Sequence, residues 1–318
     1  MRRLLLAAGV LVSLALGLLF GATPTSVIAA LQAPGSSAGL VLFQLRLPRV
    51  LLAFAVGGGL GLTGAALQAL VRNPLADPYL LGLSGGAGLG AVLAIALSAG
   101  GPWAVPLAAF AGALGAIALV YRLSVVAGRR LDPRVLLLAG VVVGAFTGAL
   151  MSAVITLAPA TQLRNAFLWL LGGFGTASWQ ALGIYAAYAV VPSGLLLFNA
   201  RQLDLMALGE EPAQYLGADI ERVKRIVYFA ASLLTAASVA VCGIIGFVGL
   251  VVPHAMRRFV GPLHGRLLPA VFFAAGAFLV LADALARTVV RPLELPVGVV
   301  TALVGVPLFI ALLRRSLR

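Results

Sequence analysis

Residues 204–224 read Asp-Leu-Met-Ala-Leu-Gly-Glu-Glu-Pro-Ala-Gln-Tyr-Leu-Gly-Ala-Asp-Ile-Glu-Arg-Val-Lys, the one long polar stretch of this chain. This polar segment holds five of the nine acidic residues and the only lysine, Lys224. So many charges cannot lie in hydrocarbon without a large cost. We therefore expect the polar segment to be where the chain meets water and an aqueous partner.

The rest of the chain is too apolar for a soluble protein. Of its 318 residues, 62% are hydrophobic and 10% are charged, whereas soluble domains carry about 25% charged residues. Apolar runs of about 20 residues, enough to cross about 30 Å of hydrocarbon, recur throughout. We expect an all-α integral membrane protein, a single domain over residues 1–318 in a lipid bilayer. The net charge of +13 is expected to set orientation in the membrane rather than to bind nucleic acid.

Alternation of apolar runs with charged breaks predicts about ten membrane helices, and a shorter helix at 163–172. The eighth span is the weakest because Pro253 and Arg257 interrupt it. The first is expected to be a retained helix, since no Ala-x-Ala-like cleavage site precedes Thr23. The predicted spans are 4–22, 47–71, 80–98, 104–127, 135–158, 180–200, 225–243, 246–260, 267–287 and 296–313.

The basic residues divide unequally between the two sides of these spans. All but five of the 22 fall on the side of the termini and of the polar segment. The positive-inside rule therefore predicts a multi-pass protein with both termini and the polar segment in the cytoplasm. The five on the periplasmic side are Arg46, Arg49, Arg164, Arg287 and Arg291.

Glycines recur at four-residue spacing, which predicts close packing of helix backbones in lipid. The Gly-x-Gly-x-x-Gly at 59–64 lies in the middle of a span and lacks a preceding strand, so packing is favoured over dinucleotide binding. The repeats are Gly57/Gly61, Gly86/Gly90 and Gly140/Gly144/Gly148.

The sequence lacks the motifs of several kinds of site. No P-loop is present, and one cysteine, Cys242, excludes an internal disulfide. His254 and His264 are expected to be structural or interfacial rather than metal ligands. Asp283 is the only acid within a span, and Arg287 four residues later predicts an ion pair rather than a proton relay. No paired acid and base or nucleophile points to an enzyme.

The polar segment is predicted to form two short helices, about 203–208 and 212–216. Gly209 and Gly217 are typical helix stops, and Glu210-Glu211-Pro212 favours a helix start. Leu205, Met206, Leu208, Tyr215 and Leu216 would form their apolar face. Two interpretations stay open: a loop that rests on its own bundle, or a rigid knob that fits a groove on a cytoplasmic partner.

Several motifs resemble the FecCD family of ABC importer permeases, which move iron-siderophores, haem and vitamin B12. They follow one another from about residue 40 to the C-terminus: Arg46-Leu-Pro-Arg49, Gly64-Ala-Ala-Leu-Gln-Ala, Arg72-Asn-Pro-Leu-Ala-Asp-Pro78, Leu81-Gly-Leu-Ser-Gly-Gly-Ala, Ala207-Leu-Gly-Glu, Gly243-Ile-Ile-Gly-Phe-Val-Gly-Leu-Val-Val-Pro-His254 and Glu294-Leu-Pro-Val-Gly-Val-Val-Thr. The resemblance implies a type II ABC importer permease in the bacterial inner membrane. Its implied partners are a second permease copy, two cytoplasmic ABC ATPase subunits that hold ATP and Mg, and a periplasmic substrate-binding protein. No cofactor is implied in this chain.

The resemblance also assigns roles to residues. The polar segment looks like the family's coupling helices, about 203–222, which dock in a cleft of the ATPase. The residues expected to carry this contact are Leu205, Leu208, Gly209, Glu210, Ala213, Leu216 and Gly217. Arg46 and Arg49 match family arginines that pair with acids of the binding protein, and Arg287 matches a third. The alternatives are that Arg46 and Arg49 extend to lipid headgroups and that Arg287 serves only Asp283.

Two gates and a pathway complete the expectation. Asn73 and Leu75 match residues that close the pathway at its cytoplasmic end, although an ordinary proline-rich turn is the alternative. The second family gate is usually rich in small hydroxyls, and Asp132-Pro133-Arg134 departs from that pattern. The pathway would follow the dimer axis along the fifth helix, the 163–172 segment and the tenth helix. Gln162, Arg164 and Asn165 would stand at its periplasmic mouth.

The sequence thus predicts the permease of an importer for a bulky metal chelate, driven through alternating access by a partner ATPase. Haem or an Fe(III)-siderophore is favoured, and cobalamin is the other option. The runner-up is a secondary carrier or channel that acts alone. A homodimer is favoured slightly over pairing with a related permease.

Overall fold

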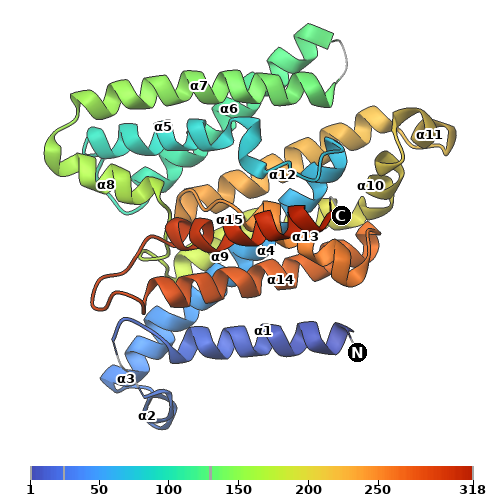
Figure 1. Ribbon diagram of the computed structural model, residues 1–318. Helices are drawn as coiled ribbons and strands as arrows, with labels where there is room; N and C mark the ends of the chain where they lie inside the picture. Colours follow the sequence, from blue (N-terminus) through green and yellow to red (C-terminus); the bar gives the residue numbers. More distant parts are fainter. Residues whose placement is uncertain (1, 24–25, 129–130, 317–318) are drawn as a thin grey trace.

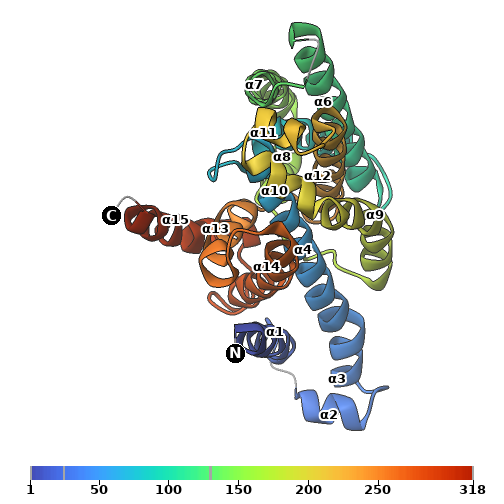
Figure 2. The same cartoon turned by 90° about the vertical axis from the view of Figure 1, so that its right-hand side faces the viewer.

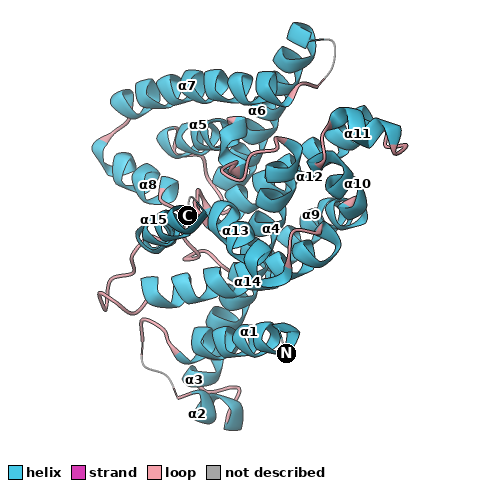
Figure 3. Ribbon diagram, turned by 45° about the vertical axis from the view of Figure 1, so that its right-hand side comes forward, coloured by secondary structure: helices cyan, strands magenta, loops and turns pink. Residues whose placement is uncertain are grey.

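The computed structural model describes residues 2–23, 26–128 and 131–316, and this part of the chain is helical without strands (Figures 1 and 3). The elements are α1 Arg2–Leu19, α2 Val27–Gln32, α3 Ser37–Leu40, η1 Val41–Arg46, α4 Leu47–Leu70, η2 Pro78–Leu81, α5 Leu83–Ala96, α6 Ala104–Gly128, α7 Pro133–Leu157, α8 Ala160–Leu170, α9 Trp179–Phe198, α10 Ala200–Ala207, α11 Glu210–Tyr215, α12 Ile220–Cys242, α13 Val248–Val260, α14 His264–Ala286 and α15 Val297–Ser316.

Every one of the ten predicted spans corresponds to a helix. Seven helical stretches in the described residues are long and apolar enough to cross a membrane, including one continuous run over Ser37–Leu70. The other three predicted spans are α5, α13 and α15, of which α13 has only 13 residues, as expected from its proline and arginine. The predicted 80–98 helix begins at Leu83, because Pro78 and a left-handed Gly82 (φ 74°) place a 3₁₀ turn before it.

The short helices between α1 and residue 47 were not predicted. Ser26 and Ser36 cap α2 and α3 by accepting bonds from Ala29 N and Gly39 N. The π-helical turn η1 then joins α3 to α4 without a break. Pro34-Gly35 interrupts the apolar pattern here, so periodicity alone gave no sign that the second span continues towards the N-terminus.

Helix α4 is the centre of the bundle. Every residue from Val56 to Leu70 is buried, and α4 packs against α9, α12, α13 and α14, as the view along the bundle shows (Figure 2). Helices α5, α6 and α7 pack on one another, and α12 links them to the α4 group. This arrangement explains why the glycines of the second span are needed.

Glycine allows backbones to meet at most of the predicted repeats. A Cβ at Gly57 would lie 2.5 Å from Ala275 O, and one at Gly90 would lie 2.1 Å from Ala108 O. The third repeat is only partly a packing surface, which corrects the prediction. A Cβ at Gly140 would meet Leu80 O at 2.3 Å, but Gly148 has nothing within 4 Å. The part of this α7 face around Gly148 therefore borders open space.

Gly64→Ala is expected to destabilise the chain by about 3 kcal/mol or more, at the upper end of overpacking effects. The added Cβ would lie 1.9 Å from Gly249 O, and a backbone oxygen cannot move without shifting α13. Thermal unfolding of the purified chain measures the loss. Gly115→Ala, where nothing lies within 4 Å, is the matched control. Equal unfolding midpoints for the two variants would contradict the packing argument.

The ends of the bundle differ in chemistry. The start of α1 and the end of α15 lie at the same end as α10 and α11 (Figure 1). We call this the polar end. The α14–α15 loop, α2 and α3 lie at the opposite end. The polar end thus carries the predicted coupling helices, and the opposite end carries the predicted docking arginines.

Candidate coupling and gating site

The polar segment folds as two short helices with a sharp corner between them. Gly209 (φ 116°) stands between α10 and α11, and Gly217 (φ 82°) follows α11. Both angles favour glycine, as the sequence predicted. The helices begin earlier than predicted: α10 at Ala200, and α11 at Glu210 with Pro212 as its third residue.

The apolar residues of the polar segment do not form one face, which corrects the prediction. Met206 is 3% exposed and Ala213 is fully buried, and Leu205 packs partly against the core. Leu208 is 63% exposed, Tyr215 91% and Leu216 61%. We call these last three residues the apolar knob. Because large exposed apolar groups beside charges mark interaction surfaces, the knob is a candidate contact for a partner.

Ion pairs fix α11, the helix that carries Tyr215 of the knob, to the bundle. Lys224 is 2% exposed, and its Nζ donates to Glu210 (2.8 Å) and Glu221 (3.2 Å). The second oxygen of Glu221 accepts a bond from Leu131 N at 3.2 Å. The lysine thus joins α11 to α12, and Glu221 joins α12 to the start of α7.

A second anchor holds α10. The carboxylate of Asp204 accepts a bond from His264 N at 2.8 Å and lies 2.6 Å from His264 Nδ1. His264 therefore has the structural role that the sequence predicted, at the first turn of α14. Each short helix is thus bonded to a long one, α11 to α12 and α10 to α14.

The predicted gate residues lie between α4 and α5, in residues 71–76. We call these residues the gate turn. Asn73 Oδ1 accepts a bond from Leu75 N at 2.9 Å, and Leu75 is 42% exposed. Arg72, in a left-handed conformation (φ 54°), lies 3.8 Å from Glu210. Both side chains are more than a third exposed to solvent, so this contact is weak. It nevertheless places Glu210 against both the gate turn and the buried lysine.

The residues after the gate turn continue the connection. Asp77 Oδ1 accepts a bond from Tyr79 N at 2.9 Å, and burial raises the pKa of this carboxyl to about 6. The hydroxyl of Tyr79 donates to Ile245 O (3.0 Å) and accepts from Ile245 N (3.1 Å). The gate turn is thereby tied to the 243–247 turn before α13.

Gln68 is the functional candidate that the sequence reasoning missed. Its Nε2 lies 3.2–3.4 Å from Ala76 O, Gly249 O and Leu250 O. Its Oε1 accepts a bond from Arg257 Nη1. One buried side chain thus joins α4, the gate turn and α13. A glutamine inside a membrane helix was the available signal, within the Gly64–Ala69 motif.

The three predicted docking arginines line one cavity of about 180 Å³ at the opposite end of the bundle. Arg49 Nη2 lies 2.8 Å from Asp283 and 2.9 Å from Glu294, and Arg287 Nε lies 3.0 Å from Asp283. The predicted pair of Asp283 with Arg287 is confirmed. The bonds of Arg49 to two acids were not predicted.

Arg46 is held inside the chain. It is 5% exposed, and it donates to Leu18 O (2.9 Å), Leu19 O (3.2 Å) and Thr23 O. Arg287 is 2% exposed and also bonds Gly17 O at 3.1 Å. Both guanidinium groups thus satisfy carbonyls near the end of α1. Pairing with another protein would require these bonds to break, whereas Arg49 keeps part of its side chain accessible.

Arg49→Ala is expected to destabilise the chain by about 3 kcal/mol, since breaking a buried ion pair by removing one partner is costly. Asp283, whose side chain is 1% exposed, would keep only Arg287. The unfolding midpoint of the purified chain measures the effect. Arg291→Ala removes an exposed arginine at the same end and should leave the midpoint unchanged. An unchanged midpoint for Arg49→Ala would show that the network contributes little.

The predicted mouth residues lie on α8. Gln162 Nε2 donates to Ser98 Oγ at 2.6 Å, and Arg164 and Asn165 are exposed. A cavity of about 340 Å³ lies between α7, the start of α5 and the 243–247 turn. Its wall is mostly apolar and includes Gly140, Gly144, Gly148, Met151 and Ile244.

Comparison with known proteins agrees with this architecture. A solved structure described as an inward-facing, metal-chelate type ABC transporter superposes with a TM-score of 0.88 and 31% identity, and covers 98% of this chain and 97% of that one. The fold is that of the type II ABC importer permeases.

Curated relatives match over most of their length. The cobalamin import system permease protein BtuC of Halobacterium salinarum is 43% identical over 278 residues, 87% of this chain and 74% of the relative. The hemin transport system permease protein HmuU of Yersinia pestis is 41% identical over 283 residues, 86% of this chain and 83% of the relative. The FecCD transport family matches residues 5–315. The chain therefore belongs to the FecCD transport family.

Proposed function

We propose that the chain is the membrane permease of an ATP-binding-cassette importer, one transmembrane domain that carries a bulky metal chelate from periplasm to cytoplasm across a bacterial inner membrane. Alternating access would move the substrate. Relatives named for cobalamin and for hemin support the chelate class. The observation that carries the proposal is an exposed apolar knob on two short helices that are bonded to the membrane helices α12 and α14.

The polar segment would be the contact with two cytoplasmic ATPase subunits. The sequence has no P-loop, so ATP and Mg would be bound by those subunits and hydrolysis would not occur in this chain. Leu208 and Leu216 present the apolar contact, with Gly209 and Gly217 setting the corners. Closure of the ATPase pair would push the knob, and Lys224 and Asp204 would pass the movement to α12 and α14.

The second copy of the chain would lie across the α7 and α15 side of the bundle. Both helices expose large apolar residues there, including Val141 (59%) beside the cavity and Leu303 (68%). The glycine-lined cavity beside α7 then faces the dimer axis. We propose that Asn73 and Leu75 close this pathway at the polar end, and that Gln162, Arg164 and Asn165 stand at the other.

A periplasmic binding protein would dock at the end opposite the knob. The cavity lined by Arg46, Arg49 and Arg287 supports this proposal, because an acidic side chain of a partner would bond the guanidinium of Arg49 there, and those of Arg46 and Arg287 once they release their carbonyls near α1. Arg49 is the most accessible of them. Glu294 of the chain would have to exchange its place with the partner's acid.

Sequence identity to the relatives does not distinguish one substrate from another. The relatives named for cobalamin and for hemin match at 43% and 41%, and haem, Fe(III)-siderophore and cobalamin all remain within the proposed class. The binding protein encoded beside this chain, and the chelate that it retains on purification, would distinguish them.

Affinity purification of the tagged chain from its native membranes tests the proposal. A nucleotide-binding subunit should co-purify, and Leu208→Ala with Leu216→Ala should reduce its yield severalfold. Val289→Ala with Leu293→Ala changes two equally exposed residues at the opposite end (64% and 67%) and should not. Purification of the wild-type chain without any ATPase would favour a carrier that acts alone.

A further inference from the structure

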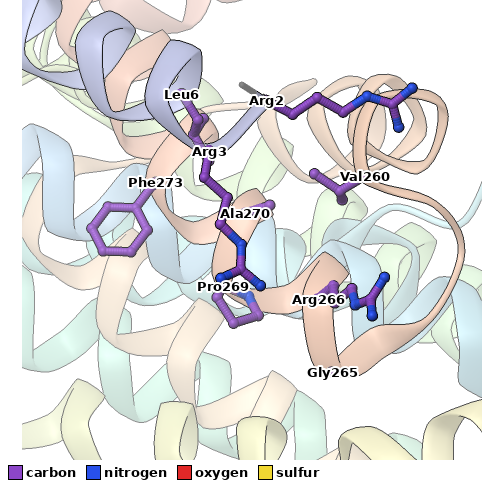
Figure 4. A pocket seen from close by; sticks show the side chains of 9 residues that line it. All are labelled: Arg2, Arg3, Leu6, Val260, Gly265, Arg266, Pro269, Ala270 and Phe273. Carbon is purple, nitrogen blue, oxygen red and sulfur yellow. The ribbon is translucent and has the colours of Figure 1, made fainter.

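Helices α1 and α14 diverge towards the polar end. Near the other end of α1 they meet tightly, because a Cβ at Gly17 would lie 2.7 Å from Val280 Cγ1. Towards the polar end the ribbons of α1 and α14 separate (Figure 1). Between the polar ends of the two helices lies a pocket of about 430 Å³ (Figure 4).

Three arginines surround this pocket. Arg2 and Arg3 extend from the first turn of α1, and Arg266 comes from the first turn of α14 (Figure 4). Within the described residues, none of the three side chains has a hydrogen bond or ion pair, and no acid lines the pocket. Asp204 approaches the same turn of α14, but its bonds go to His264. Three like charges around one space repel one another unless an anion lies among them.

The remaining wall of the pocket is apolar. Leu6 on α1 faces Ala270 and Phe273 on α14, and Phe273 is 45% exposed. The neighbouring Leu4 and Leu5 are 74% and 57% exposed, as expected of a helix that meets lipid. Basic side chains at the end of a membrane helix, above an apolar groove, match the two parts of a phospholipid, its phosphate and its acyl chains.

We propose that this pocket binds the phosphate headgroup of an anionic phospholipid, with an acyl chain along Leu6 and Phe273. The lipid would fill the gap between α1 and α14 and neutralise the three arginines. A free phosphate offers the same charge, but the apolar wall that opens beside α1 favours the lipid. The inference requires only that the chain spans a membrane, so it does not depend on the proposed transport function.

Native mass spectrometry of the delipidated full-length chain, titrated with phosphatidylglycerol or with phosphatidylcholine of the same acyl chains, tests the site. We expect tight binding of phosphatidylglycerol and several-fold weaker binding of phosphatidylcholine. Arg3→Gln with Arg266→Gln should weaken phosphatidylglycerol binding about twenty-fivefold, since each arginine near an anionic lipid contributes about fivefold. Arg266→Gln alone should weaken it about fivefold and serves if the double variant does not purify.

Arg122→Gln with Arg222→Gln is the matched control, because both arginines are exposed and lie on the same predicted side of the membrane. This control should bind phosphatidylglycerol like the wild type, as should Arg3→Lys with Arg266→Lys. A parallel thermal-shift series replaces the lipid by inorganic phosphate and should show no stabilisation. Equal binding of the two lipids, equal losses in both glutamine pairs, or stabilisation by phosphate as strong as by phosphatidylglycerol would each overturn the proposal.

Discussion

Glu210→Arg is expected to abolish substrate uptake while the assembled complex continues to hydrolyse ATP. Glu210 bonds the buried Lys224 at 2.8 Å and lies 3.8 Å from Arg72. The arginine would place a positive charge against both. Lys224 keeps Glu221 at 3.2 Å, so we expect α11 to lose its attachment rather than the bundle to unfold. Uptake and ATPase activity measured on the same reconstituted preparation test this.

The matched control for Glu210 is its neighbour. Glu211 undergoes the same change of charge in Glu211→Arg, but it is exposed and forms no ion pair among the described residues. This variant should retain most of the uptake. If the two variants behave alike, the anchoring of α11 by Lys224 is not what transmits the movement.

Gln68→Ala is expected to lower the free energy of unfolding by about 3 kcal/mol or more and to loosen the gate turn. It would remove the two amide hydrogens shared among the carbonyls of Ala76, Gly249 and Leu250, and the oxygen that accepts from the Arg257 guanidinium. Each buried group left unpaired costs about 1–3 kcal/mol, although water and local rearrangement recover part of the sum. The thermal midpoint of the purified chain and proteolysis within residues 71–82 measure the two effects.

Gln180→Ala is the control for Gln68. Gln180 is exposed near the start of α9, and its removal should change neither quantity. A Gln68→Ala variant with the wild-type midpoint and the wild-type cleavage rate would show that this side chain does not hold the gate turn to α13.

Local chemistry made much of the fold predictable from the sequence. The length of the apolar runs located the membrane helices. Gly209 and Gly217 located the turns of the polar segment, because few other residues adopt their positive backbone φ angles. The pairing of Asp283 with Arg287 followed from the four-residue spacing. Each of these features depends on residues close together in the chain.

Features that depend on distant neighbours were missed. Gln68 meets Gly249 and Arg257 from more than 180 residues away, and no periodicity reports such a contact. The burial of Lys224 was hidden for the same reason, since a lysine in a charged stretch normally reads as exposed. Leu208 and Met206 belong to one apolar set in sequence, yet they lie two residues apart at the end of α10, about 200° apart around the helix, so one faces out and the other in.

The four-residue spacing of glycines did not predict which of them pack against a neighbouring helix. Gly57 and Gly148 follow the same four-residue rule, but only Gly57 meets a neighbouring backbone. A small residue permits close approach without requiring it. Which glycines pack and which border a cavity depends on where the next helix passes.

Transport into proteoliposomes is the most direct test of the proposed function. The vesicles contain the chain with its co-purifying partners, enclose ATP, and are offered radiolabelled haem, Fe(III)-siderophore or cobalamin with the binding protein. We expect accumulation of one chelate that requires ATP and is unchanged by a protonophore. Accumulation by the chain alone, without ATP and abolished by the protonophore, would contradict an ATP-driven importer.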